Sequence, residues 1–333
     1  MKRFVLVLAL IPSYALAQPQ SVAIVGAAIL TGTGDTIENG VLVFKDGKIV
    51  SVGAADGAPP AEASIIEGEG LYLTPGLIDA HSQYGIQGSS WDPANLAVPG
   101  RDVLEPFKPE EKPLWLRSGV TTTFISPGGQ NLLGGYGAVV KLTGALVRER
   151  AALVASFGET ALDAFEAPTT RQGMIAILRQ TFIRGREDAL VDEGGKAIGL
   201  ALSKEIPLHV IANTPDDILT ALRFSREFDL RLVLVSAMGG HQVASQIAAA
   251  SVPVIVGPSI IGIGDGGPFE GFPHTPANAA RLAEAGVSIA LSTFARRGRS
   301  VALEGVMAKA HGLPPESALR AVTSDAAAIL GVE

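Results

Sequence analysis

Eight short runs of apolar and β-branched residues recur along the chain, and stretches with helical patterns separate most of them. This alternation is typical of a parallel sheet built from strand–helix units, and eight such units close a (β/α)8 barrel. The chain has 333 residues, which is enough for a barrel of about 250 residues and a small accessory region. We expect strands at residues 77–81, 121–125, 138–142, 152–157, 206–211, 232–235, 252–256 and 287–291.

Two of the intervening helices begin with the same pair of residues. Thr214 precedes Pro215, and Thr275 precedes Pro276. Proline fits the first position of a helix, and the preceding threonine can cap the free backbone N–H groups there. Gly286 is well placed to end the second of these helices. The sequence therefore predicts an α/β fold with a TIM-type barrel over residues 74–333.

The chain before the barrel has strand patterns without helices. Short apolar runs at residues 21–25, 41–44 and 48–52 and an extended piece at 65–73 are interrupted by the turn Lys45-Asp46-Gly47-Lys48, where glycine suits a positive φ. They predict a small N-terminal β region over residues 18–73.

The first 17 residues have the pattern of a secretory signal peptide. Lys2 and Arg3 precede an apolar run, and Ala15-Leu16-Ala17 is a small-x-small cleavage site. The run is shorter than the roughly 20 residues that span a bilayer. We therefore expect cleavage before Gln18, a periplasmic or secreted protein, and no membrane insertion after the signal is removed.

Composition excludes several other classes of protein. Apolar residues make up 47% of the chain and charged residues 18%, which excludes an intrinsically disordered chain. The chain contains no cysteine, so it has neither a lipid anchor on cysteine nor a disulfide. Basic residues are scattered apart from the cluster at 296–299, and the net charge is −7, so we expect no nucleic-acid partner.

The stretch Thr74-Pro75-Gly76-Leu77-Ile78-Asp79-Ala80-His81-Ser82-Gln83 places a histidine at the end of the first barrel strand. Side chains alternate along a strand, so His81 and Gln83 point the same way. The stretch resembles the start of the barrel in the amidohydrolase superfamily, in particular its periplasmic, imidazolonepropionase-like branch, which reads Pro-Gly-Leu-Ile-Asp-x-His-x-His. Gln83 stands where that pattern has its second histidine.

The resemblance implies a metal site at the carboxyl ends of the strands, where bound metal activates water to attack a C–N bond. Flanking motifs locate four further ligand positions of the family. Val154 replaces a lysine that becomes carboxylated, Ile211 and Ser236 replace histidines, and Phe294 replaces an aspartate. Of the six positions, only His81 is kept. A catalytic zinc normally needs three protein ligands, so we expect His81 and Gln83 to be vestiges of a metal site.

Two functions remain open from these residues. The first is a homologue that has lost metal-dependent C–N hydrolysis, uses no cofactor and acts as a binding or partner subunit. The alternative is an active amidohydrolase for amide, peptide-like or cyclic C–N bonds, with a metal-free site or a rebuilt zinc site. Possible substitute groups are His209, His241 and Asp265. Whether the chain is an enzyme stays undecided at this point.

The family resemblance also implies further strands after the barrel, which complete the N-terminal β region. The chain here ends at Glu333, so we expect an incomplete N-terminal β-sandwich with unpaired strand edges. A natural short form and a truncation are both open. Unpaired edges favour association, either with a related active amidohydrolase or with further copies of this chain.

Overall fold

The computed structural model describes residues 21–55, 59–88, 90–109, 112–158, 161, 170–187, 192–259, 274–295 and 300–333. The chain divides into two compact units, Met1–Thr74 and Pro75–Glu333. In the described part of the chain, no helix combines the length and the apolar character needed to cross a membrane. The predicted signal peptide, the basic cluster at 296–299 and the candidate ligand Asp265 lie outside the described residues.

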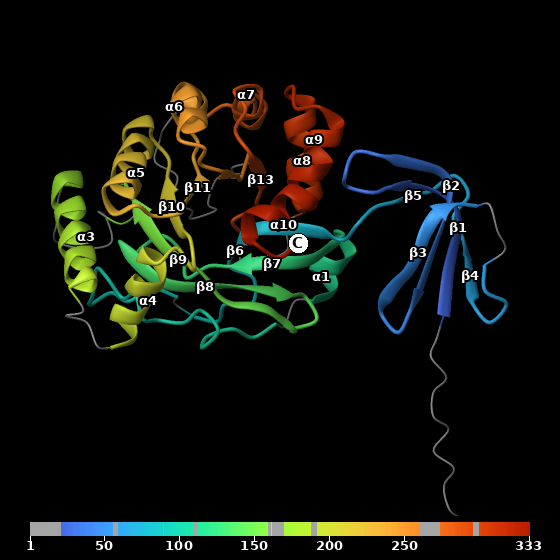
Figure 1. Ribbon diagram of the computed structural model, residues 1–333, viewed down its shortest axis with the longest axis horizontal. Helices are drawn as coiled ribbons and strands as arrows, with labels where there is room; N and C mark the ends of the chain where they lie inside the picture. The colour runs from blue at the N-terminus through green and yellow to red at the C-terminus, as the bar shows by residue number, and fades with distance from the viewer. Residues whose placement is uncertain are drawn as a thin grey trace, which may run out of the picture. The chain divides into compact units, whose positions relative to one another are not determined.

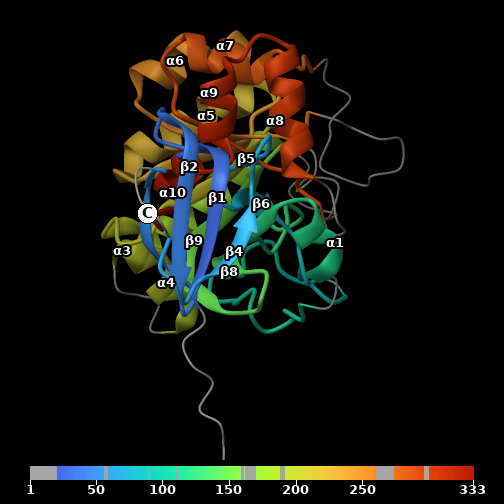
Figure 2. The same ribbon diagram turned by 90° about the vertical axis from the view of Figure 1, so that its right-hand side faces the viewer.

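The described part of the first unit is a five-stranded sheet. Its strands are β1 (Ser21–Leu30), β2 (Thr36–Lys45), β3 (Lys48–Ala54), β4 (Ser64–Glu67) and β5 (Tyr72–Leu73). The order is β3-β2-β1-β4, and β5 also pairs with β1. Strands β2, β1 and β4 are seen side by side in Figure 2. No second sheet is found among the described residues of this unit, so the expected sandwich is not confirmed.

The second unit contains an eight-stranded sheet in the order β13-β12-β11-β10-β9-β8-β7-β6. All eight predicted strands are present, although five are longer and three are shorter than expected. They are β6 (Leu77–Ser82), β7 (Val120–Ile125), β8 (Leu133–Lys141), β9 (Leu146–Phe157), β10 (Leu208–Ala212), β11 (Leu232–Ser236), β12 (Val254–Val256) and β13 (Ile289–Leu291). This mixed α/β unit with a nearly closed sheet confirms the barrel prediction in outline.

One part of the prediction was wrong, because the sheet is not parallel throughout. Strand β8 pairs antiparallel with both β7 and β9. Only Leu142 to Ala145 connect β8 to β9, and Gly144 adopts a φ of +93° in that turn. A parallel connection needs a dozen or more residues, so this short link can form only a hairpin.

Helices follow one another around the outside of the sheet (Figure 1). They are α1 (Lys112–Arg117), α3 (Arg171–Arg186), α4 (Glu193–Leu202), α5 (Pro215–Phe228), α6 (Ala244–Ala249), α7 (Asn278–Glu284), α8 (Val301–Ala310), α9 (Pro315–Ala321) and α10 (Ser324–Leu330), with a short 3₁₀ turn η1 (Gly240–Gln242). Thr214 caps α5 as predicted, since its hydroxyl accepts from the backbone N–H of Asp217. Thr275 does not cap α7, whose N-cap is Ala277 and makes no side-chain hydrogen bond.

The sheet closes through polar contacts between β6 and the segment after β13. The backbone N–H of Phe294 donates to the carbonyl of His81 at 3.0 Å, and that of Gln83 donates to Ala295 at 3.0 Å. The side chain of Asp79 accepts from Thr293 twice, from its N–H at 3.1 Å and from its hydroxyl at 2.5 Å. Two apolar layers result, one between strands and helices and one inside the barrel.

Candidate functional site

His81 lies at the carboxyl end of β6 and is completely buried. Its ring stacks on that of Phe294, with 4.2 Å between centroids and 25° between planes. The ring of Phe124 lies 5.7 Å away on a tilted plane. Neither ring nitrogen of His81 has a hydrogen-bond partner among the described residues. Burial holds the pKa of His81 well below its usual value, and the nearby His209 lowers it further, so the imidazole is neutral.

Val154 and Ile211 are buried in the apolar cluster inside the barrel, and Phe294 packs against the same cluster. Val154 is completely buried, and Ile211 has 1% of its surface exposed. Three of the positions to which the resemblance assigned lost ligands therefore pack within one apolar cluster. A carboxylate or ammonium placed here would lose its hydration, which makes this interior a poor environment for charge.

Ser236 ends β11 and is also buried, and its hydroxyl has no partner among the described residues. Its backbone has a φ of +67°, a conformation that L-residues other than Asn and Asp seldom adopt. Ser236 lines a small cavity together with Met238, His274 and Asn278. The volume is about 10 Å³, which holds about one water molecule.

Gln83 follows β6 and points towards the loop after β7. A Cβ built on Gly128 would lie 2.6 Å from the side-chain nitrogen of Gln83. Glycine at position 128 therefore leaves the room that this amide occupies.

Of the possible substitute ligands, His209 lies on β10 with 1% of its surface exposed. Its ring is 4.8 Å from that of Phe124, and neither of its nitrogens has a described partner. Burial lowers the pKa of His209 to about 3, and the positive charges of Arg148 and Arg231 contribute. His241 lies in η1, half-buried, and its backbone N–H donates to Asn278 at 2.9 Å.

These residues do not fit a catalytic metal. Within the described residues, no three His, Cys, Asp or Glu side chains come together as a metal site requires. His81 and His209 both contact Phe124, but His241 does not join them in such a group. In the described part of the apolar interior, His81 and His209 supply two imidazoles, which is short of the three ligands of a catalytic zinc site.

Asp79 is a buried polar residue at this site to which sequence reasoning gave no role. It has no exposed surface, and burial raises the pKa of its carboxyl group to about 7 despite the hydrogen bonds from Thr293, which lower it. Its spacing of two residues before His81 was visible in the sequence. Its partner Thr293 was not, because the two residues lie 214 positions apart.

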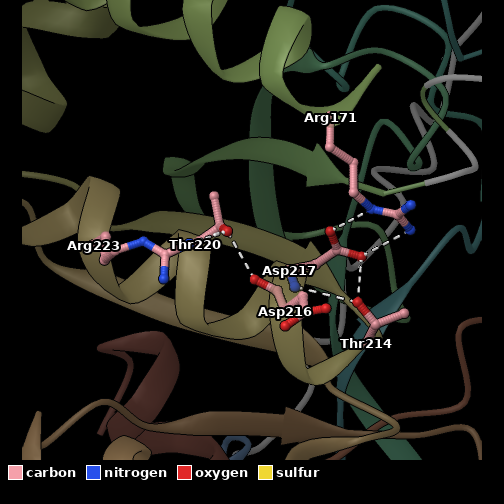
Figure 3. Close-up of polar contacts among 6 residues, drawn as sticks. All are labelled: Arg171, Thr214, Asp216, Asp217, Thr220 and Arg223. Carbon is pink, nitrogen blue, oxygen red and sulfur yellow. Dashed lines mark hydrogen bonds and ion pairs between the residues drawn. The ribbon is translucent and has the colours of Figure 1, made fainter. Parts of the chain in front are cut away.

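A second polar cluster joins the first turns of α3 and α5 (Figure 3). The guanidinium of Arg171 donates to both carboxylate oxygens of Asp217, at 2.8 and 3.3 Å. The hydroxyl of Thr214 donates to the same carboxylate at 2.7 Å. Because Asp217 is 3% exposed and accepts all these bonds, the cluster is a structural clamp between two helices at the carboxyl edge of the sheet.

The sequence itself gives only a short match to a known protein. No model of a known protein family matches the sequence. A stretch of 71 residues is 37% identical to imidazolonepropionase from Sphingopyxis alaskensis, and it covers 20% of this chain and only 18% of that protein.

Solved structures cover far more of the chain. The crystal structure of an amidohydrolase from Thermotoga maritima MSB8 superposes with a TM-score of 0.84 and 25% identity, over 94% of this chain and 89% of that one. A β-aspartyl dipeptidase from Fervidobacterium islandicum AW-1, in complex with a β-Asp-Leu dipeptide, superposes with a TM-score of 0.54 and 18% identity, over 93% and 87% of the two chains. The dipeptidase shows the fold alone. Together with the motif that ends at His81, the match to the Thermotoga protein shows that the chain belongs to the amidohydrolase superfamily.

Proposed function

We propose that this chain is a non-catalytic amidohydrolase homologue that acts as a binding or partner subunit. The observation that carries the proposal is the stacking of Phe294 on His81, at 4.2 Å between ring centroids. An apolar ring occupies the place where a metal-bound group would have to meet the imidazole. Since catalysis by a bound metal needs an open, polar coordination site, the described residues offer no means to activate water in the family's way.

The sheet of the first unit supports a role in association. Pairing in register brings Val52, Leu42, Ile24 and Ile66 into one apolar row across four strands. Val52 and Ile66 are each 49% exposed, and Ile49 beside the row is 67% exposed. Exposed apolar rows and open strand edges favour association. The candidate partners are a related active amidohydrolase and a second copy of this chain.

Metal content tests the loss of catalysis. We expect chain purified after growth with added zinc to hold far less than one metal ion per chain, and to turn over none of a panel of amide, dipeptide and cyclic-amide substrates. As a matched control, a variant carrying Gln83→His, Val154→Lys, Ile211→His, Ser236→His and Phe294→Asp should gain metal if it folds. Stoichiometric zinc in the unmodified chain that is lost in His81→Ala would refute the proposal.

Association is tested separately by light scattering and by affinity purification from the native host. Self-association that rises with concentration, or recovery of a related hydrolase, would support the role of subunit. The substitution Val52→Lys should weaken either complex. A monomer at all concentrations that recovers no partner would contradict that role, whatever the metal content.

A further inference from the structure

A second cavity lies at the opposite end of the barrel from His81, at the amino ends of the strands. Its volume is about 530 Å³, within the range of roughly 300–1,000 Å³ that is usual for small-molecule sites. The residues immediately before four consecutive strands line it, and they are Pro207, Arg231, Pro253 and Ser288. Helix α10 adds Ala328 and Ile329 from the other side.

The backbone at this end offers few acceptors to a ligand. The carbonyl oxygens of the four residues before the strands each accept a hydrogen bond from the N–H of a neighbouring strand, at 2.8 to 3.0 Å, and the donors are Leu153, Leu208, Leu234 and Val254. The polar character of the cavity therefore comes from side chains.

Those side chains are mainly donors. Arg231 is exposed and donates one hydrogen bond, to the carbonyl of Lys204 at 3.1 Å. It forms no ion pair within the described residues. Ser251 and Ser288 add exposed hydroxyls. The carboxylate in the lining, Asp325, already pairs with Arg320 at 3.5 Å. A guanidinium without a counter-ion prefers a carboxylate, which it can bind through two parallel hydrogen bonds.

The rest of the lining is apolar. Leu230, Val252 and Ile329 form a wall that reaches Val233, and Val233 pairs directly with His209 on the neighbouring strand. A ligand in this cavity would thus have its charged head at the rim, on Arg231, and an apolar body against the wall.

We propose that this cavity binds a small molecule with one carboxylate group and an apolar chain. The site is independent of the positions that the family uses for metal. Arg231 recognises the carboxylate, the two serine hydroxyls complete its hydrogen bonding, and the apolar wall holds the chain.

Octanoate is a suitable probe, and its binding to the full chain can be followed by calorimetry and by NMR. Octanol has a similar chain without the charge, and acetate has the charge without the chain. We expect octanoate to bind, and both other probes to bind at least about tenfold more weakly, because a charge-assisted hydrogen bond and apolar burial each contribute more than one factor of ten.

Three variants make the test specific. Arg231→Gln should weaken octanoate binding at least about tenfold, since a charge-assisted bond is lost, whereas Arg223→Gln on the exposed side of α5 should leave it unchanged. Ala250→Phe places a bulky ring in the cavity from an exposed position and should abolish binding. Circular dichroism confirms that each variant is folded. No octanoate binding at about 10 mM, equal binding of octanol, or full binding by folded Arg231→Gln would overturn the proposal.

Discussion

Replacing the buried imidazole of His209 by leucine should change how the stability of the barrel depends on pH. In the folded chain the pKa of His209 is lowered from 6.5 to about 3. A depressed pKa contributes stability that is fully present above pH 6.5 and is lost as the pH falls towards 3, because only the unfolded chain takes up the proton. The full difference corresponds to about 5 kcal/mol.

At pH 5 the loss is only partial. This pH is about 1.5 units below the unfolded pKa and still well above the folded one, so the folded state loses about 2 kcal/mol of stability relative to neutral pH. His209→Leu removes this loss. It also removes two ring nitrogens that have no described partner, which should stabilise the barrel by roughly 1 kcal/mol at every pH.

Urea unfolding at pH 7.5 and pH 5.0 measures both effects, with the fluorescence of Trp115 in the barrel core as the signal. We expect the unfolding free energy of His209→Leu to exceed that of the unmodified chain by about 1 kcal/mol at pH 7.5 and by about 3 kcal/mol at pH 5.0. His311→Gln, at an exposed histidine, is the control and should follow the unmodified chain. Equal differences at the two pH values would refute the reasoning, because they would mean that His209 is protonated in the folded state too.

Four further substitutions test other parts of the barrel, and the fourth is the control for the third. Asp79→Asn should have the opposite pH dependence to His209→Leu. Because the pKa of Asp79 is raised to about 7, its carboxyl group contributes stability that is present below pH 3.8 and lost as the pH rises to 7. The unfolding free energy of the variant should therefore fall less between pH 4 and pH 7 than that of the unmodified chain. Ser236→Gly should raise the melting temperature, because glycine relieves the φ of +67° and contributes about 1 kcal/mol; a lower melting temperature would contradict strain there. Arg171→Ala should cost about 2 kcal/mol in urea unfolding, because it leaves the buried carboxylate of Asp217 short of donors. Arg179→Ala breaks an ion pair whose side chains are 44% and 40% exposed and should cost under about 0.5 kcal/mol; equal losses in the two variants would show that burial of Asp217 does not matter.

The sequence predicted most of the barrel because its strands are apolar, β-branched runs. It did not predict that β8 runs antiparallel to its neighbours. The prediction of a parallel sheet assumed a helix between every two strands, but the short link that contains Gly144 leaves no room for one between β8 and β9. The position of His81 at a strand end followed from the motif, and the amidohydrolase resemblance is confirmed.

The surroundings of His81 were beyond the reach of sequence reasoning. Local patterns identify Phe294 as apolar and His209 as ionisable. They do not show that the ring of Phe294 stacks on His81 or that His209 lowers the pKa of His81. The bond between Asp79 and Thr293 depends on how the barrel closes. Long-range contacts of this kind follow from packing and not from local preference.

The contact between Asp79 and Thr293 also has a consequence for the order of folding. The strands β7, β8 and β9 are adjacent in sequence and can pair early, because closing short loops costs little entropy. The two residues that fasten β6 to the far end of the sheet are separated by 214 positions, so their encounter costs more chain entropy than the pairing of adjacent strands. We therefore expect the barrel to grow as an open, curved sheet and to close last, with the carboxyl group of Asp79 joining its two edges.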